Sequence, residues 1–138
     1  MFEFVFSGQE GTKGGTGTVT GRILGLEDNL ANQMADAVIL DSAVFNDGSP
    51  FDLGLLTQGR DATLWDDQGF NSFSVSGGEI QTFAFSAENS TAGTSGSIQD
   101  FLGIGAAVAQ LIVNEEGGAD FEVVGGILGG GSLTFSQV

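Results

Sequence analysis

The residues of this sequence best suited to binding a ligand are its acidic side chains, which could coordinate metal ions. The candidate metal ligands are Asp47, Asp52, Glu115, Glu116 and Asp120. Asp47 and Asp52 bracket a Gly-Ser-Pro turn, and the other three surround Gly117-Gly118. Because calcium prefers several carboxylate and carbonyl oxygens from one loop, these stretches predict calcium sites. None has the spacing of the twelve-residue calcium loop with its closing Glu, and the alternative is that these acids are solvated loop residues.

The composition excludes several catalytic chemistries. The chain contains no Cys and no His, so thiol nucleophiles, Ser-His-Asp triads and the usual zinc sites are absent. A pair of carboxylates could serve a glycosidase, but with eighteen acids the surface interpretation is favoured. Residues 103–108 resemble a dinucleotide-binding turn only superficially, because Val108 stands where Gly or Ala is needed. We therefore expect a protein that is not an enzyme, with no catalytic and no cofactor-binding residues.

The strongly negative net charge makes some classes of binding partner unfavourable. Eighteen acidic residues against three basic ones give a formal net charge of −15. Such a charge repels nucleic acids and anionic membrane surfaces, and no apolar run is long enough for a membrane span. The candidate partners that remain are calcium, extracellular polysaccharide and a second copy of the chain. Self-association would need metal ions or an apolar seam to offset the repulsion.

Length and composition predict the fold class. A chain of 138 residues is expected to form one domain, residues 1–138. Its 24 Gly and 12 Phe, with many Ser and Thr, favour strands joined by tight turns. Short alternating runs between turn signals predict an all-β fold, a jelly-roll-like antiparallel β-sandwich of about eight to ten strands.

The stretch Asn71–Ala87 gives the strongest local prediction. Phe73 and Val75 alternate with serines, Gly77-Gly78 follows, and Phe83 and Phe85 alternate again, which predicts a hairpin. A two-residue turn would place Phe73 and Phe83 on opposite faces. We therefore expect a three-residue loop that also includes Glu79 and puts the four apolar side chains on one face.

The rest of the chain is predicted as short strands with one helical turn. Phe2–Phe6 and Thr16–Leu26 should pair, with a bulge near Gly21. Helical spacing predicts a short helix over residues 29–35, running into a strand from Asp36 to Val44. Glu88–Ser97 is predicted as a surface loop, and Trp65 as a core residue rather than a sugar-binding platform. Further strands are expected at Phe51–Leu56, Thr63–Trp65, Ser97–Leu102, Ala106–Val113, Asp120–Val124 and Ser132–Gln137.

Several segments together resemble the body of bacterial secreted proteins of the PEP-CTERM, exosortase-sorted family. They are GTGTVTG at 15–21, GLEDN at 25–29, FSVSGGEI at 73–80, FAFSA at 83–87 and the closing SLTFSQV at 132–138. The resemblance implies a mature domain whose signal peptide and C-terminal sorting signal are missing from this sequence. It also implies export to the cell surface or matrix, and it assigns no catalytic residue.

Two functions are therefore expected. The first is a non-catalytic, secreted structural protein of the cell surface or extracellular matrix. Its β-prone ends, Phe2–Phe6 and Leu133–Phe135, lack Lys and Pro and could add strands to a neighbour's sheet. The alternative is a calcium-dependent polysaccharide-binding module in which Trp65 or a loop Phe stacks on sugar.

Overall fold

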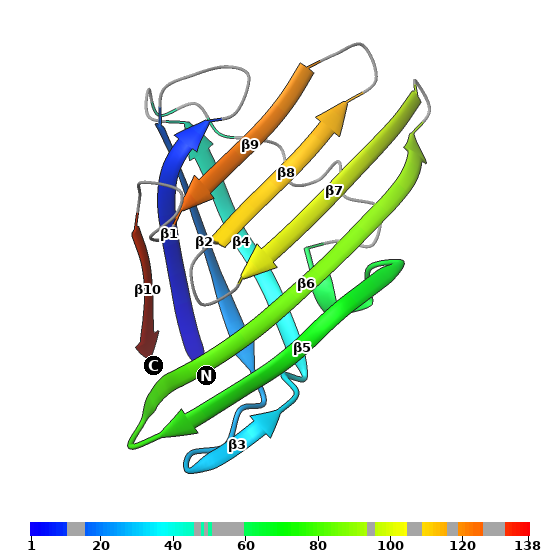
Figure 1. The fold of residues 1–138 in the computed structure, drawn as a ribbon. Helices are drawn as coiled ribbons and strands as arrows, with labels where there is room; N and C mark the ends of the chain where they lie inside the picture. The colour runs from blue at the N-terminus through cyan, green and yellow to red at the C-terminus, as the bar shows by residue number, and fades with distance from the viewer. Residues whose placement is uncertain are drawn as a thin grey trace.

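The computed structural model describes most of the chain: residues 1–10, 16–45, 48, 50, 60–93, 96–104, 109–115, 119–125 and 132–138. These residues form an all-β fold (Figure 1). The strands are β1 (Phe2–Glu10), β2 (Thr16–Leu24), β3 (Leu30–Gln33), β4 (Ala37–Phe45), β5 (Asp67–Ser76), β6 (Glu79–Gly93), β7 (Gly96–Ile104), β8 (Ala109–Glu115), β9 (Ala119–Gly125) and β10 (Ser132–Gln137). One short 3₁₀ helix, η2, spans Ala62–Leu64.

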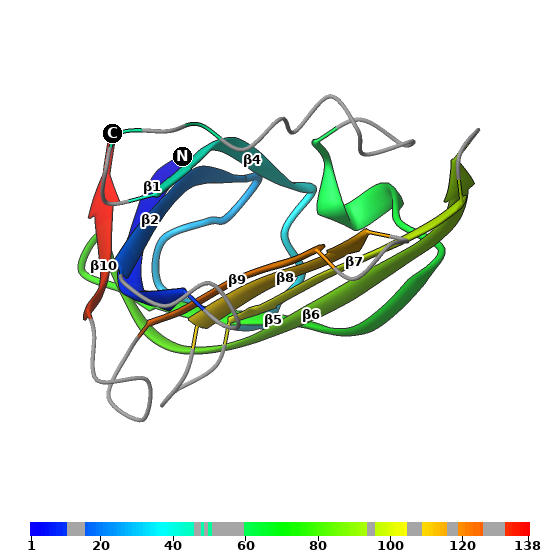
Figure 2. The ribbon, with the colours of Figure 1, turned by 90° about the horizontal axis from the view of Figure 1, so that it is seen from above.

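The strands pair antiparallel in the order β3-β5-β6-β7-β8-β9-β1-β2-β4, and β10 adds to β1 beside this path. Seen from above, they form two layers, with β1, β2 and β4 facing β5 to β9 (Figure 2). Strand β1 joins the layers because it pairs with β10 from Phe2 to Ser7 and with β9 at Gln9 and Glu10. The order is mostly sequential, and it does not confirm the jelly-roll arrangement.

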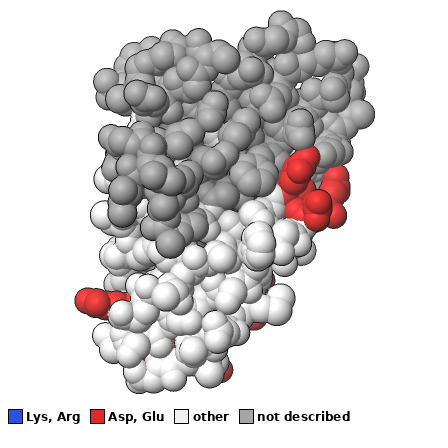
Figure 3. Space-filling view, in the orientation of Figure 1, with Lys and Arg blue, Asp and Glu red and all other residues white. Residues whose placement is uncertain are grey.

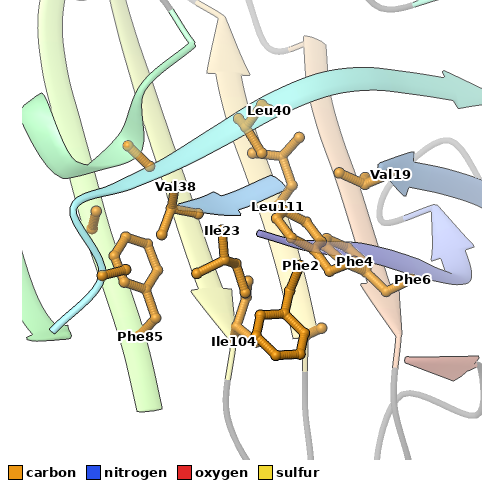
Figure 4. Close-up of a cluster of buried hydrophobic side chains, with 14 of the residues drawn as sticks. Phe2, Phe4, Phe6, Val19, Ile23, Val38, Leu40, Phe85, Ile104 and Leu111 are labelled. Atoms are coloured by element: carbon orange, nitrogen blue, oxygen red, sulfur yellow. The ribbon is translucent and has the colours of Figure 1, made fainter. Parts of the chain in front are cut away.

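The core lies between the two layers. Phe2, Phe4 and Phe6 alternate along β1 and are all buried, as period-2 patterning requires. They belong to one cluster with side chains from both layers, including Leu111 of β8 beside Phe4 and Phe85 of β6 at the other end of the cluster (Figure 4). Next to η2, Trp65 is 5% exposed, so the prediction that it is a core residue is confirmed.

The hairpin of β5 and β6 confirms the shared apolar face but not the predicted loop. Ser76 pairs with Glu79, so the turn has two residues, Gly77 and Gly78, both with positive φ (61° and 78°) as a type I′ turn requires. The three-residue loop is wrong because a register shift follows the turn. Between the Ser74↔Thr82 and Val75↔Ile80 pairs, β6 carries one extra residue, Gln81. This bulge brings Phe73 opposite Phe83 on the core face.

The helix expected over residues 29–35 is also wrong. Asn29 and Asn32 have positive φ (56° and 53°), a conformation that Asn tolerates and that breaks a right-handed helix. The segment instead holds β3, which pairs with β5 at Leu30↔Val75 and Gln33↔Phe73. The following strand, predicted from Asp36 to Val44, is confirmed as β4.

Two other expectations need correction, and one lies outside the described residues. The strand expected at Thr63–Trp65 is replaced by η2, whose start is capped by Asp61 accepting a hydrogen bond from the Thr63 backbone N–H. The surface loop expected at Glu88–Ser97 is instead part of β6 and β7, which pair as far as Gly93↔Gly96. The expected strand Phe51–Leu56 falls outside the described part of the chain.

The predicted irregularity near Gly21 is confirmed. The β2–β4 register shifts between Thr20 and Gly21, because Asp41 is an extra residue on β4. The bulged Asp41 carboxylate accepts two short hydrogen bonds from the Arg22 guanidinium, both 2.8 Å long. This hydrogen bonding, with the attraction between the two charges, raises the pKa of Arg22 above its usual value. Because both side chains are more than a third exposed, the pair contributes little to stability.

Candidate functional site

The structure places only part of the predicted calcium ligands. Asp47, Asp52 and Glu116 lie outside the described residues. Glu115 ends β8 opposite Ala119, and Asp120 pairs with Asn114, so the backbones of Glu115 and Asp120 meet at one end of the β8–β9 hairpin. The calcium sites therefore stay a prediction. Within the described residues, no group of three acidic side chains is arranged to hold a metal ion.

Trp65 cannot serve as an exposed platform for sugar, because its ring belongs to the core. Among the aromatic side chains whose exposure the structure describes, Phe70 on β5 is exposed, at 65%. Phe70 lies three residues before the buried Phe73, so the alternation of side chains along β5 places its ring on the face opposite the core. The sequence analysis did not single it out, because the predicted hairpin began at Asn71. Phe70 thus takes the place of the loop Phe named in the polysaccharide hypothesis.

The edge of β10 is the feature that the fold leaves most open. Strand β10 pairs with β1 along one side, and no described strand pairs with its other side. The backbone N–H of Val138 donates to the carbonyl oxygen of Met1 at 3.0 Å, which makes these opposite residues a hydrogen-bonded pair. Alternate residues of an antiparallel strand point their backbone groups to opposite sides. The N–H and C=O groups of Leu133, Phe135 and Gln137 therefore point away from β1.

Side chains divide along β10 in the same alternating way. Ser132, Thr134 and Ser136 are exposed, whereas Leu133 and Phe135 are half-buried on the core side. The Phe135 ring meets Phe83 of β6 edge-on, with ring centroids 4.8 Å apart. This contact holds β10 against the second layer while its outer edge stays open.

A groove of about 440 Å³ adjoins this edge, where the end of β10 approaches the β5–β6 turn. It is lined by Phe2, Gly78, Glu79, Ile80, Phe135, Ser136 and Gln137. Its lining includes two aromatic residues, Phe2 and Phe135, and one ionisable residue, Glu79. The groove therefore joins the uncharged strand β10 to one acidic side chain of the β5–β6 hairpin.

The two terminal strands differ in their pairing, because β1 is paired on both sides and β10 is paired with a described strand on one side. The expectation that Phe2–Phe6 could complete a neighbour's sheet is wrong, because β1 already has β2 on one side and β10 on the other. The chain ends pair with each other, and this moves the open edge to β10. The expected strand Ser132–Gln137 is confirmed with the same bounds.

Figure 3 shows the surface charge on the face that Figure 1 presents. The charged side chains visible among the described residues of this face are acidic, which agrees with the net charge of −15. Strand β10 has neither an acidic nor a basic residue. Its edge is thus an uncharged strip on a strongly acidic molecule.

Within the described residues, no helix has the length and hydropathy that crossing a membrane would require. No family model, curated protein or solved structure matches the chain. The structural features that bear on function are therefore the β10 edge and the groove beside it.

Proposed function

We propose that this protein is a non-catalytic structural protein of the cell surface or extracellular matrix, which associates with itself by adding strands at a sheet edge. The observation that carries the proposal is the open edge of β10, with three residues whose backbone groups point outward. Unpaired N–H and C=O groups along an edge form a template for another strand. We take the fold to be a jelly-roll-like sandwich. In this function it presents the β10 edge rather than a catalytic cleft.

Edge strands of natural proteins are usually protected, and β10 lacks the common forms of protection. Lys, Pro, bulges and inward-pointing charges are the usual devices. Strand β10 contains no charged residue and no Pro, and its register with β1 runs without a shift from Ser132 to Gln137. A strand of six residues with this sequence supports a binding role for the edge.

Secretion is part of the same proposal. The acidic composition and the resemblance to exosortase-sorted proteins suit a domain that works outside the cell. At the surface of a bacterium, local concentration can be high enough for a weak edge contact to assemble molecules. A calcium-dependent contact between acidic loops, with Glu115 and Asp120 among the ligands, would add to the edge contact.

A second candidate, a calcium-dependent polysaccharide-binding module, is favoured by Phe70. The 65% exposed ring lies on β5 and pairs across to Ser86, so an apolar face is next to a hydroxyl that can hydrogen-bond. Aromatic rings beside hydroxyl groups suit the alternating apolar and polar surfaces of sugars. Phe70→Ala should abolish binding on a glycan array if this function is correct, and unchanged binding would exclude Phe70 as the platform.

The main proposal is tested by measuring the mass of the protein in solution. Multi-angle light scattering over a wide range of protein concentrations, with calcium and with chelator, should show mass rising above 14.1 kDa as concentration increases. Moderate salt should strengthen the association, because it screens the repulsion between molecules of charge −15. A monomer under every condition would contradict self-association.

A further inference from the structure

We propose that two copies of this chain pair β10 against β10, antiparallel, about a two-fold axis that passes through Phe135. The inference rests on the proposed self-association and specifies its partner, its symmetry and its register. The resulting dimer joins one layer of each molecule into a continuous sheet, β4-β2-β1-β10 followed by the same strands of the partner in reverse order.

A closed dimer is expected rather than a fibre because the other ends of the described sheet are poor templates. Strand β4 is engaged on its outer side by bridges from Ile39 to Asp61 and from Val44 to Pro50. Strand β3 has four residues, and Asn29 and Asn32 put left-handed backbone at its start and within it. A fibre needs two competent edges per molecule, whereas one edge that pairs with itself closes after two copies.

The direction of the backbone groups restricts the register. Leu133, Phe135 and Gln137 point their N–H and C=O groups outward, so each must lie opposite an outward-pointing residue of the partner. Placing Phe135 opposite the partner's Phe135 also places Leu133 opposite the partner's Gln137. All three outward residues then form hydrogen-bonded pairs. Shifting the axis by one residue, to Thr134 or Ser136, leaves one of the three without a described counterpart.

Side chains favour the same register. On the core side, Phe4 pairs with Phe135 within each molecule, so the axis would create a row of four rings: Phe4, Phe135, the partner's Phe135 and the partner's Phe4. Aromatic pairs across strands stabilise a sheet. On the outer side, Ser136 would lie opposite the partner's Thr134, and both are small and exposed.

The absence of charged residues from β10 favours this strand as the contact between two copies of the chain. Two acidic residues among the described ones lie beside β10: Glu3, which is opposite Ser136 on β1, and Glu79, which lines the groove together with Ser136 and Gln137. Across the dimer, each Glu3 would be three strand spacings, about 14 Å, from the partner's β1. This separation exceeds the Debye length of about 8 Å at physiological ionic strength. The uncharged strip therefore keeps each Glu3 away from the partner's β1, whereas Glu79 at the end of β10 adds a repulsion that salt screens.

Engineered cysteines test the register directly, because the chain has no Cys of its own. In the proposed register Thr134 lies opposite the partner's Ser136, in a pair without hydrogen bonds, where Cα atoms are about 4.5 Å apart and a disulfide fits. The double variant Thr134→Cys/Ser136→Cys should therefore oxidise to a covalent species of twice 14.1 kDa. Each single variant should stay mostly monomeric on a non-reducing gel.

The alternative registers give different results in the same experiment. If Thr134→Cys alone forms the covalent dimer, the axis passes through Thr134, and if Ser136→Cys alone does, it passes through Ser136. Either result overturns the Phe135 register. A wild-type protein that associates while none of the variants forms cross-links overturns the β10 contact but leaves self-association standing. A wild-type protein that stays monomeric overturns both, and circular dichroism of the exposed-site variants checks that they are folded.

Discussion

The backbone N–H of Gly78 donates a hydrogen bond to Asp28 Oδ1 at 2.9 Å, and this bond fixes the β5–β6 turn against a segment fifty residues earlier in the chain. The neighbouring Gly77 N–H donates to Asn29 Oδ1 at 3.1 Å. In a two-residue turn these two N–H groups have no partner within the hairpin. Asp28 and Asn29 supply the partners, and they place the turn beside the β10 groove.

Asp28→Ala should lower the free energy of unfolding by about 1 kcal/mol, because the Gly78 and Asn29 N–H groups lose a charged acceptor. Urea denaturation followed by circular dichroism measures the change. Glu27→Ala is the matched control, since the Glu27 side chain is exposed next to the same turn. Equal stability of the two variants would show that the Asp28 carboxylate does not fix the turn.

Gly77→Asn should leave the protein as stable or raise its free energy of unfolding by about 0.4–1 kcal/mol. Gly77 has φ of 61°, nothing surrounds the position of a Cβ atom there, and Asn is favoured at the first position of a type I′ turn. Thermal unfolding is the appropriate measurement. A drop in melting temperature would mean that the turn conformation differs from type I′.

Gly21→Ala should lower the free energy of unfolding by about 1–3 kcal/mol, because a Cβ atom there would clash with the Phe4 ring and with the Ile39 carbonyl oxygen. The ring of Phe4 covers Gly21 on the neighbouring strand, and the backbone oxygen cannot move freely. A double-mutant cycle with Phe4→Leu separates the two clashes. Coupling between the substitutions is expected, and strictly additive losses would argue against the ring contact.

Trp65→Ala should reduce stability by about 3–5 kcal/mol, since the ring is buried beside η2. Leu64→Ala, at a neighbouring side chain that is 63% exposed, should change stability little. Guanidinium titrations of both variants give the comparison. A small loss of stability in Trp65→Ala would indicate that this ring is exposed rather than buried, and Trp65 would again be a candidate for stacking on sugar.

The sequence predicted those features that depend on local pattern. Alternating phenylalanines predicted β1 and the shared face of β5 and β6, the glycine cluster before Ser132 predicted where β10 begins, and glycine between β-branched residues predicted the irregularity near Gly21. The helix near Asn29 failed because helical spacing of apolar residues coincided with two Asn residues in left-handed conformation. The hairpin loop failed because a bulge at Gln81 can restore a register that the turn alone would not allow.

The candidate site was harder to predict for a different reason. Whether a strand is an edge depends on pairing between residues far apart in sequence, such as Phe4 with Phe135. Both terminal segments look alike by composition, and only the fold distinguishes β1, with partners on both sides, from β10. Burial of Trp65 likewise depends on where η2 is placed, whereas the exposure of Phe70 follows from its alternation with Phe73 along β5.

Sedimentation velocity of a β10 variant tests the central claim most directly. Thr134→Glu/Ser136→Glu places two added charges on exposed positions of β10, and Leu64→Glu/Ala31→Glu adds the same charge at exposed positions on η2 and β3. At a concentration where the wild type is dimeric, the β10 variant should sediment as a monomer and the control as a dimer. If both variants dimerise like the wild type, or if both dissociate to the same extent, the β10 edge is not the contact between molecules.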